Sequence, residues 1–506
     1  MKATATINIH EKLGQVHPYI YGQYFEHLGN CIYPSVSDKN SPLSDDMELR
    51  VDVIEAAKEL GVPVIRWPGG CYVDLYDWRD GVGPRDQRPA RHNWHWEGVE
   101  SNRYGTDEFL HWCEAVGADP YINVNLGTGT LVDMLRWIDY CNGEETADAK
   151  WRQENGREKP YDVKLWGIGN ETWGFWEAGQ LSAEEYAHKL ANWSQFVKKY
   201  DPAIRLLGVG SYKGVDQHWD STVIDKAGKF LDYLTIHIYG CSMDRQSNEE
   251  YYPIVFSTVY FERQLRKMAQ TIKETVRRNK LQLDKPIQLS LDEWNIRHYE
   301  RNDEGKYTLN RNSPRNLQDA LFVAGIFNVM IRLSPLVGMA NYVFLVNGNG
   351  VMNVTDDQVV RTPLYHVFKQ YGAWMVGERV HIDVHSPMML TPAPQIGSPE
   401  YTVEVAASYE PEPAPIIDSA AVLRENGELC ISLVNRDLTD DHEVTLILPS
   451  GYKQAEVWTL VHEDIHATNT PQFPNTVVPV IGQAVSNSNI VELPAHSITL
   501  VRCIAQ

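Results

Sequence analysis

The chain has 506 residues, more than a single hydrophobic core usually supports, so we expect two domains. Its formal charge of −21 at pH 7 would repel nucleic-acid phosphates and anionic lipids, so neither nucleic acid nor a membrane is expected as a partner. The hydrophobic fraction is 43%, and no stretch approaches the roughly 20 consecutive apolar residues of a membrane span.

The first residues, MKATATINIHEKLG, predict an extended segment rather than a targeting signal. Apolar and polar residues alternate over residues 3–9, as in a half-buried strand. The segment has no continuous apolar run and no small-residue cleavage site, so we expect a cytoplasmic location. The seven cysteines are odd in number and widely scattered, which predicts buried free thiols and no zinc site.

Eight short apolar runs, bounded by Gly, Pro or Asp, alternate with amphipathic stretches along most of the chain. The runs are residues 19–26, 62–68, 120–126, 163–171, 204–211, 233–239, 287–294 and 341–347. Strands that alternate with helices in this way predict an α/β fold of the (β/α)8 TIM barrel type, although a doubly wound open sheet shows the same alternation.

From about residue 375 the sequence changes character and predicts an all-β domain. Proline-rich stretches such as residues 411–415, which resemble linkers, are interspersed with strand-like runs at residues 429–435 and 444–448. We therefore predict a catalytic barrel over residues 17–374 and a C-terminal β-sandwich domain over residues 375–506. The N-terminal strand of residues 1–16 is expected to join the sandwich.

Two of the predicted barrel strands end in a glutamate, Glu171 in the fourth run and Glu293 in the seventh. Active sites of TIM barrels lie at the carboxyl ends of the strands, so both carboxyl groups are expected at one mouth. Glycoside hydrolysis needs such a pair, one protonated and one ionised. A single strand-end glutamate is more often a helix cap or a surface charge, but two in register favour catalysis.

Asp292 competes with Glu293 for the role of nucleophile. Neighbouring side chains on a regular strand point to opposite faces, so only one of the two is expected to face the barrel mouth. We assign that position to Glu293.

Other polar side chains fall at neighbouring strand ends. Glu26, Arg66, His237 and Tyr239 are expected to converge on the same mouth. The structural alternatives are a buried ion pair between Arg66 and Glu26 and a packed core histidine at position 237. Several of the 15 tryptophans also lie near these strand ends, where an aromatic face stacks on a sugar ring or packs in the core.

Six motifs, spread in order along nearly the whole chain, together resemble the α-L-arabinofuranosidases of glycoside hydrolase family 51. They are FEHLG at residues 25–29, IRWPGG at 65–70, DGVGP at 80–84, NLGT at 125–128, GNE at 169–171 and DEWN at 292–295. The resemblance implies a (β/α)8 barrel with a β-sandwich, a carbohydrate substrate, retention of anomeric configuration, no metal or other cofactor, and a homo-oligomer, either a hexamer or a tetramer.

The resemblance also assigns roles by position. Glu171 matches the acid/base of the family, and Glu293 matches its nucleophile. Residues that match the furanoside pocket are Glu26, Arg66, Cys71, Asn170, His237 and Tyr239, and those that match its aromatic walls are Trp96 and Trp176. In three places the chain departs from some members: Cys71 replaces Asn, Phe344 replaces Gln, and Arg297 replaces Trp.

The implied activity is that of an exo-acting, retaining α-L-arabinofuranosidase that releases terminal arabinofuranosyl residues from oligosaccharides or hemicellulose fragments. A β-xylosidase or an endoglucanase on the same scaffold stays open, because sugar preference depends on the pocket walls. A carbohydrate-binding protein without catalysis is disfavoured because both glutamates are present. A metal-assisted barrel enzyme is disfavoured because the strand ends carry few clustered Asp and His residues.

Overall fold

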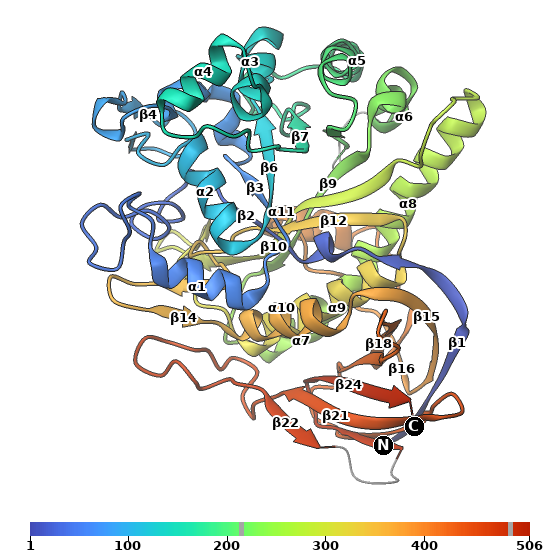
Figure 1. Cartoon of the computed structure of the whole chain (residues 1–506). Helices are drawn as coiled ribbons and strands as arrows, with labels where there is room; N and C mark the ends of the chain where they lie inside the picture. The colour runs from blue at the N-terminus through green and yellow to red at the C-terminus, as the bar shows by residue number, and fades with distance from the viewer. Residues whose placement is uncertain (212–216, 484–488, 506) are drawn as a thin grey trace.

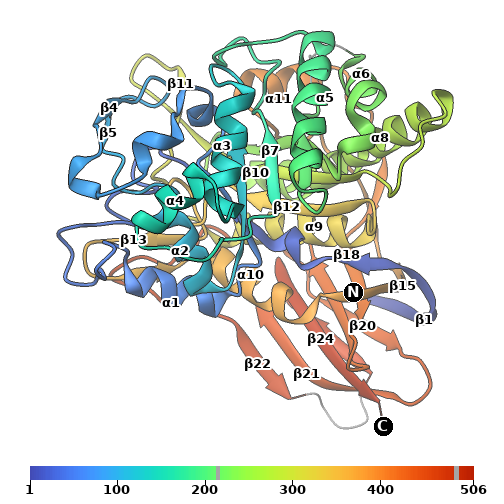
Figure 2. The same cartoon turned by 45° about the horizontal axis from the view of Figure 1, so that its top comes forward.

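The computed structural model describes residues 1–211, 217–483 and 489–505, and eight of its strands form a closed parallel barrel (Figures 1 and 2). In hydrogen-bonded order they are β2 (Gly22–Tyr24), β3 (Val64–Trp67), β6 (Asp119–Val124), β7 (Leu165–Ile168), β8 (Arg205–Gly208), β9 (Tyr233–Ser242), β10 (Gln288–Arg301) and β12 (Val337–Tyr342). Pairing of β9 with β10 and of β12 with β2 closes the ring. The predicted TIM barrel is therefore confirmed, and the open sheet is ruled out.

Each predicted run overlaps one barrel strand, but the last is displaced. We expected it over residues 341–347, whereas β12 begins at Val337. Gly338 interrupts the apolar pattern from which the strand was predicted. The position excludes a larger residue, since a Cβ atom there would lie 2.5 Å from the side-chain oxygen of Gln288. The residues after Tyr342 instead leave the strand at the barrel mouth.

Helices cover the outside of the barrel (Figure 1). They are α1 (Val51–Leu60), α2 (Thr106–Val116), α3 (Leu131–Asn142), α4 (Ala147–Glu154), α5 (Ala183–Tyr200), α6 (Trp219–Ala227), α7 (Tyr251–Val255), α8 (Ser257–Arg278), α9 (Leu317–Arg332) and α10 (Pro363–Trp374). α5 begins with a capping box between Ser182 and Glu185, and its buried face carries Tyr186, Leu190 and Trp193. Among the described helices, none combines the length and the apolar character needed to cross a membrane.

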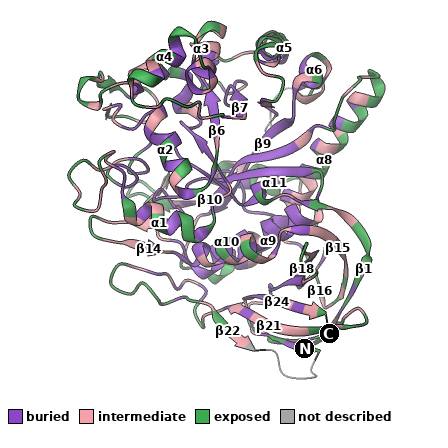
Figure 3. Cartoon of the chain, viewed as in Figure 1, coloured by how far each residue is buried: buried purple, intermediate pink, exposed green. Residues whose placement is uncertain are grey.

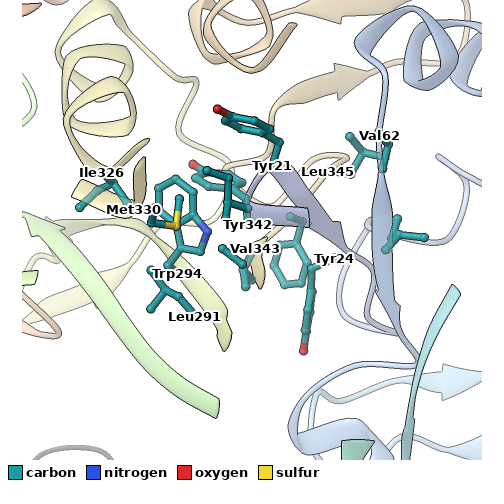
Figure 4. Close-up of a cluster of buried hydrophobic side chains, with 14 of the residues drawn as sticks. Tyr21, Tyr24, Val62, Leu291, Trp294, Ile326, Met330, Tyr342, Val343 and Leu345 are labelled. Atoms are coloured by element: carbon teal, nitrogen blue, oxygen red, sulfur yellow. The ribbon is translucent and has the colours of Figure 1, made fainter. Parts of the chain in front are cut away.

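Helix α9 lies between the barrel and the C-terminal sheet. It contacts β10 and α10 on the barrel side and β18, β19 and β24 on the other. Nearly every residue of α9 is buried, as expected for a helix that is apolar on all sides (Figure 3). Figure 4 shows its Ile326 and Met330 beside Trp294 of the barrel. This apolar layer packs against the part of β10 that carries Trp294 and its neighbour Glu293.

The C-terminal domain is one nine-stranded sheet that curls into a sandwich. Its order is β22 (Val480–Gln483), β21 (Tyr452–Leu460), β24 (Ser497–Ala505), β19 (Leu429–Asn435), β18 (Ile417–Leu423), β15 (Gly377–His385), β1 (Lys2–Val16), β20 (His442–Ile447) and β23 (Ile490–Leu493). The edge strand β23 contacts β19 and β24, so the two halves of the sheet enclose an apolar core. β1 lies between β15 and β20.

One segment of the C-terminal region returns to the barrel. The backbone N–H of Gly397 donates to the Tyr239 carbonyl at 2.8 Å, and Cys241 N–H donates to the Gln395 carbonyl at 3.1 Å. Helix α11 (Pro399–Ala406) follows this contact. Residues 413–415, which we expected in a linker, form β17 (Pro413–Pro415) and pair with β16 (Met388–Leu390). Prolines are tolerated there because a two-stranded ribbon leaves backbone N–H positions unpaired.

Candidate active site

A pocket opens at the carboxyl ends of the barrel strands, and the predicted site residues gather around it. Six of them line the pocket: Glu26, Cys71, Trp96, Glu171, Tyr239 and Glu293. The other four are joined to this lining by hydrogen bonds, directly or through one another: Arg66, Asn170, Trp176 and His237. The structure therefore brings all ten residues together.

Glu171 leaves β7 through a sharp turn. Gly169 has a φ of +90°, and Glu171 itself has a φ of +39°, which is uncommon for a residue with a side chain. The Glu171 carboxylate accepts a hydrogen bond from Trp176 Nε1 at 3.0 Å and lies 2.7 Å from His237 Nδ1. The left-handed backbone and these two contacts hold the carboxylate at the pocket wall.

Glu293 is positioned by an irregularity in β10. The register of β10 against β9 shifts between Ser290 and Glu293, as in a β-bulge. The Glu293 carboxylate accepts hydrogen bonds from Arg66 Nη1 at 2.8 Å and from the Tyr239 hydroxyl at 2.5 Å. One of its oxygens lies within 4.8 Å of a Glu171 oxygen. The two carboxyl groups are close enough to act on the same glycosidic bond.

Asp292 also faces the barrel interior, which corrects our expectation that only one of the pair would do so. Its carboxylate accepts a hydrogen bond from the Tyr121 hydroxyl at 3.0 Å and lies 3.2 Å from His237 Nε2. The register shift in β10 breaks the side-chain alternation on which the expectation depended. Asp292 is buried beneath the pocket, and of the two acidic residues Glu293 is the one that lines it.

His237 lies among three carboxylates. Its Nδ1 is 2.7 Å from Glu171 and 3.4 Å from Glu293, and its Nε2 is 3.2 Å from Asp292. Burial alone would lower the pKa of His237, but the charges of Glu293 and Asp292 and the hydrogen bond with Glu171 raise it to about 10. Both ring nitrogens therefore carry protons at neutral pH, and each faces a carboxylate.

The contact with His237 also decides the charge on Glu171. Burial by itself would raise the pKa of this carboxyl group, but the hydrogen bond and charge of His237 lower it below its usual range. The charge of Arg297 acts in the same direction. In the resting site Glu171 is therefore ionised, and the proton between the two groups lies on His237.

Arg66 organises the floor of the site. Its Nη1 donates to Glu293, and its Nη2 donates to Asn170 Oδ1 at 2.7 Å. Among the residues that the structure describes, the ion pairs of Arg66 are with Asp292 and Glu293 rather than with Glu26. The predicted pair with Glu26 is therefore replaced by direct contact with the proposed nucleophile. Because one planar guanidinium donates to both Asn170 and Glu293, it fixes their positions relative to each other.

Glu26 presents its carboxylate to the same pocket. Its Oε1 accepts hydrogen bonds from the backbone N–H groups of Gly70 and Tyr72 and from Trp96 Nε1, at 3.1, 3.3 and 2.9 Å. Burial, followed by the charge of Glu293, raises the pKa of Glu26. The other oxygen, Oε2, accepts a hydrogen bond from the Tyr24 hydroxyl at 3.2 Å and keeps a second lone pair for a ligand hydroxyl.

Two glycines make room for these carboxylates. A Cβ atom at Gly69 would lie 2.4 Å from Glu26 Cγ, and one at Gly70 would lie 2.7 Å from Glu293 Oε1. Gly69 also has a φ of +143°, which residues with side chains rarely adopt. The Pro-Gly-Gly sequence after β3 is therefore required by the close approach of two acidic side chains.

Comparison with known proteins agrees with this geometry. Residues 56–254 match the α-L-arabinofuranosidase 1 domain, and residues 292–497 match the α-L-arabinofuranosidase C-terminal domain. The α-L-arabinofuranosidase C of Emericella nidulans is 34% identical over 98% of this chain and 97% of its own. The chain belongs to the α-L-arabinofuranosidase family.

Other family 51 α-L-arabinofuranosidases share the complete architecture. The intracellular exo-α-L-arabinofuranosidase of Bacteroides ovatus is 32% identical over 98% of this chain and 95% of its own. The thermostable family 51 α-L-arabinofuranosidase of Thermotoga petrophila has a structure that matches with a TM-score of 0.86 at 32% identity, covering 99% of this chain and 100% of that one. The likeness therefore includes both the barrel and the C-terminal sheet.

The three positions at which we expected departures from other members all line the pocket. Cys71 is partly exposed, whereas the other six cysteines are buried. The Arg297 guanidinium lies 3.6 Å from the centroid of the Tyr239 ring, and Phe344 packs beside Tyr24 with ring centroids 5.5 Å apart. Arg297 and Phe344 belong to the β10 and β12 side of the pocket, whereas Cys71 follows β3.

Sequence reasoning missed several members of this site. The Tyr24 hydroxyl donates to Glu26 at 3.2 Å and lies 3.5 Å from Glu293. Strand alternation would have found Tyr24, because it lies two residues before Glu26. Arg311 lies 5.3 Å from the centroid of the Trp96 ring, in an irregular segment where no periodic signal points to it.

Proposed function

We propose that this family 51 member is a retaining, exo-acting enzyme that releases terminal α-L-arabinofuranosyl residues from oligosaccharides or hemicellulose fragments. The observation that carries this proposal is the approach of Glu171 and Glu293 to within 4.8 Å, oxygen to oxygen. Retaining glycosidases place their two carboxyl groups roughly 5–5.5 Å apart, whereas inverting enzymes need roughly 6.5–9.5 Å to admit a water. The short separation supports direct attack by a carboxylate.

Glu293 is the nucleophile in this proposal. Its carboxylate attacks the anomeric carbon, a glycosyl ester forms, and the bond to the leaving oxygen breaks. The hydrogen bonds from Arg66 and Tyr239 aim the carboxylate and limit its rotation. Asp292 is buried against Tyr121 and His237 and does not line the pocket, which supports the choice of Glu293.

Glu171 is the acid/base, and His237 holds its proton before the reaction. As Glu293 becomes an ester it loses its negative charge, so one of the charges that keep the proton on His237 disappears. As the bond to the leaving oxygen breaks, the proton passes from His237 Nδ1 to Glu171 and on to that oxygen. In the second half-reaction a water attacks the anomeric carbon, the ester bond breaks and the Glu293 carboxylate is released. Glu171 accepts a proton from the attacking water, and His237 takes that proton back.

The remaining predicted residues bind the sugar. Glu26 and Tyr239 line the pocket beside Glu293 and offer acceptors and donors to the furanose hydroxyls, and Asn170 is held next to Glu293 by Arg66, which donates to both. Cys71 lies at the rim. Trp96 and Trp176 supply aromatic faces, and Trp176 is 44% exposed, which suits contact with a leaving-group sugar.

Location and assembly are part of the same proposal. We infer a cytoplasmic enzyme, which the name of the intracellular Bacteroides ovatus relative supports. We also infer a homo-oligomer, a hexamer or a tetramer. Exposed apolar side chains at the end of the sheet domain, Phe473, Val480 and Ile481, support association of copies. Light scattering coupled to gel filtration gives the subunit number.

A panel of 4-nitrophenyl glycosides tests the activity. We expect hydrolysis of the α-L-arabinofuranoside with kcat/KM far above that for the β-D-xyloside or the β-D-glucoside, and full activity in the presence of EDTA. The Glu293→Gln variant is the control for catalysis at this site. A preference for the xyloside or glucoside would replace the proposed substrate, and equal activity of the variant would move catalysis elsewhere.

A further inference from the structure

Two buried carboxyl groups lie behind the pocket wall, and the proposed reaction does not use them. Asp74 is in the short helix η2 (Cys71–Leu75), and Glu177 is in the loop between β7 and α5. Asp74 is 0% exposed, and Glu177 is 5% exposed. The two side chains form a hydrogen bond with each other.

That hydrogen bond requires a proton, because two ionised carboxylates offer acceptors only. Asp74 Oδ1 accepts from the Gly127 backbone N–H at 3.2 Å, and Glu177 Oε1 accepts from Asn170 Nδ2 at 3.1 Å. The remaining oxygens, Asp74 Oδ2 and Glu177 Oε2, are buried, and no N–H or O–H group of the described residues donates to them. A proton between these oxygens satisfies both.

The surroundings favour a single proton on the pair. Burial raises the pKa of Asp74, and burial together with the charge of Asp74 raises the pKa of Glu177. The charge of Glu171, on the pocket side, also favours the protonated form of both groups. Lys189 of α5 faces Asp74, and the Cys71 thiol contacts Glu177; these two groups favour the ionised form. One carboxylate therefore keeps its charge while the other holds the proton.

We infer that Asp74 and Glu177 share one proton and together position the Asn170 carboxamide for the reaction. An acceptor at Glu177 Oε1 directs the Asn170 NH2 group toward it, which leaves the Asn170 carbonyl facing Arg66. Arg66 in turn donates to Glu293. Asp74 and Glu177 are thus positioning residues at the start of a hydrogen-bonded chain that ends at the proposed nucleophile.

Loss of the shared proton breaks this arrangement. Two adjacent buried carboxylates repel each other and separate, so Asn170 loses the acceptor that fixes its orientation. Part of the loss of activity at alkaline pH therefore comes from deprotonation of this pair, and this part is separate from the titration of the acid/base. The positioning role rests on the proposed function, because it is read out through Glu293, whereas the shared proton does not depend on that function.

The isosteric Glu177→Gln variant tests the positioning role. Its new carboxamide would donate to Asp74 and accept from Asn170, as the protonated acid does, but it cannot lose the proton. On an aryl arabinofuranoside we expect Glu177→Ala to lower kcat by about tenfold to a hundredfold, as misplacement of a reacting group does. Glu177→Gln should recover most of the lost activity at pH 6. In its pH–activity profile, the decline on the alkaline side should lie at higher pH than in the unmodified enzyme. Glu184→Gln, on the exposed face of α5, is the matched control.

Unfolding measured against pH tests the shared proton without any substrate. The raised pKa values mean that the folded protein holds a proton that the unfolded chain releases, so the free energy of unfolding falls as the pH rises toward the alkaline range. Glu177→Gln removes this dependence. The stability of Glu177→Gln relative to the unmodified protein should therefore increase from pH 6 to pH 9.

The outcomes separate the two claims. Parallel loss of stability in the Glu177→Gln variant and the unmodified protein would overturn the shared proton. Failure of Glu177→Gln to recover activity that Glu177→Ala loses would overturn the positioning role. An unmodified enzyme that is inactive on arabinofuranosides would refute the proposed function and the positioning role together, while the unfolding comparison would still decide whether the proton is shared.

Discussion

His237 Nδ1 lies 2.7 Å from Glu171 Oε1, so the proposed acid/base is in direct contact with a cationic imidazole. The charges of Glu293 and Asp292, together with this contact, raise the pKa of His237, and the contact lowers the pKa of Glu171, although burial acts on each group in the opposite sense. In the proposed reaction the catalytic proton therefore starts on His237, one hydrogen bond away from Glu171, which delivers it. Because the negative charge of Glu293 also keeps the proton on His237, loss of that charge favours transfer of the proton to Glu171.

The first prediction concerns the stability contributed by His237. Its pKa is raised to about 10, so its contribution is fully present below its ordinary pKa of about 6.5 and is lost as the pH rises through 10. We expect His237→Gln to lower the free energy of unfolding most near pH 6 and least near pH 10. Urea titrations across this range measure the difference, with the exposed His188→Gln as control. A difference that does not change with pH would contradict the cationic state.

The second prediction separates the acid role of Glu171 from its other contacts. Glu171→Ala should lower kcat/KM for arabino-oligosaccharides by about 10²–10⁴-fold, because the poor leaving oxygen needs a proton. For 2,4-dinitrophenyl α-L-arabinofuranoside, whose leaving group departs without help, kcat/KM should fall far less. The exposed Glu184→Ala is the control. Equal losses on both substrates would show that Glu171 is not the acid.

The third prediction concerns Cys71. Burial, together with the charges of Glu177 and Glu171, raises the pKa of this thiol, so little thiolate is present at neutral pH. Inactivation by iodoacetamide should therefore be slow at pH 7 and should accelerate as the pH rises. Arabinose should protect the enzyme, and Cys71→Ser should resist the reagent. Inactivation of Cys71→Ser at the unmodified rate would place the sensitive thiol elsewhere.

Much of the site could be predicted because it depends on local sequence. Parallel strands bring their carboxyl ends to one mouth, so Glu171 and Glu293 could be placed together from their positions at strand ends alone. Glu26 and Arg66 follow from the same argument. The motifs that resemble family 51 then assigned roles to side chains that strand position could not distinguish.

Other features could not be predicted because they depend on contacts between distant segments. The inward direction of Asp292 follows from a register shift of β10 against β9. The partnership of Asp74 with Glu177 joins two segments that follow different barrel strands, β3 and β7, and no periodic pattern marks either residue. The return of Gly397 to Tyr239 likewise appears only when the barrel and sheet domain are assembled.

The fourth prediction is that Glu293 forms the covalent intermediate. Glu293→Ala should abolish turnover of natural substrates, because no carboxylate is left at this place in the pocket to attack the anomeric carbon. Azide should restore turnover of an activated aryl arabinofuranoside by entering the vacated space. Mass spectrometry and NMR should identify a glycosyl azide of inverted configuration. Asp292→Ala is the comparison: rescue by azide in that variant, and not in Glu293→Ala, would transfer the nucleophile role to Asp292.

The anomeric configuration of the first product tests the central claim most directly. The separation of Glu171 and Glu293 by no more than 4.8 Å between oxygens leads us to expect double displacement and therefore net retention. Proton NMR of an α-L-arabinofuranoside during the first minutes of hydrolysis by the unmodified enzyme should show α-L-arabinofuranose before mutarotation. Initial appearance of the β anomer would contradict the covalent mechanism and the role of Glu293 in it.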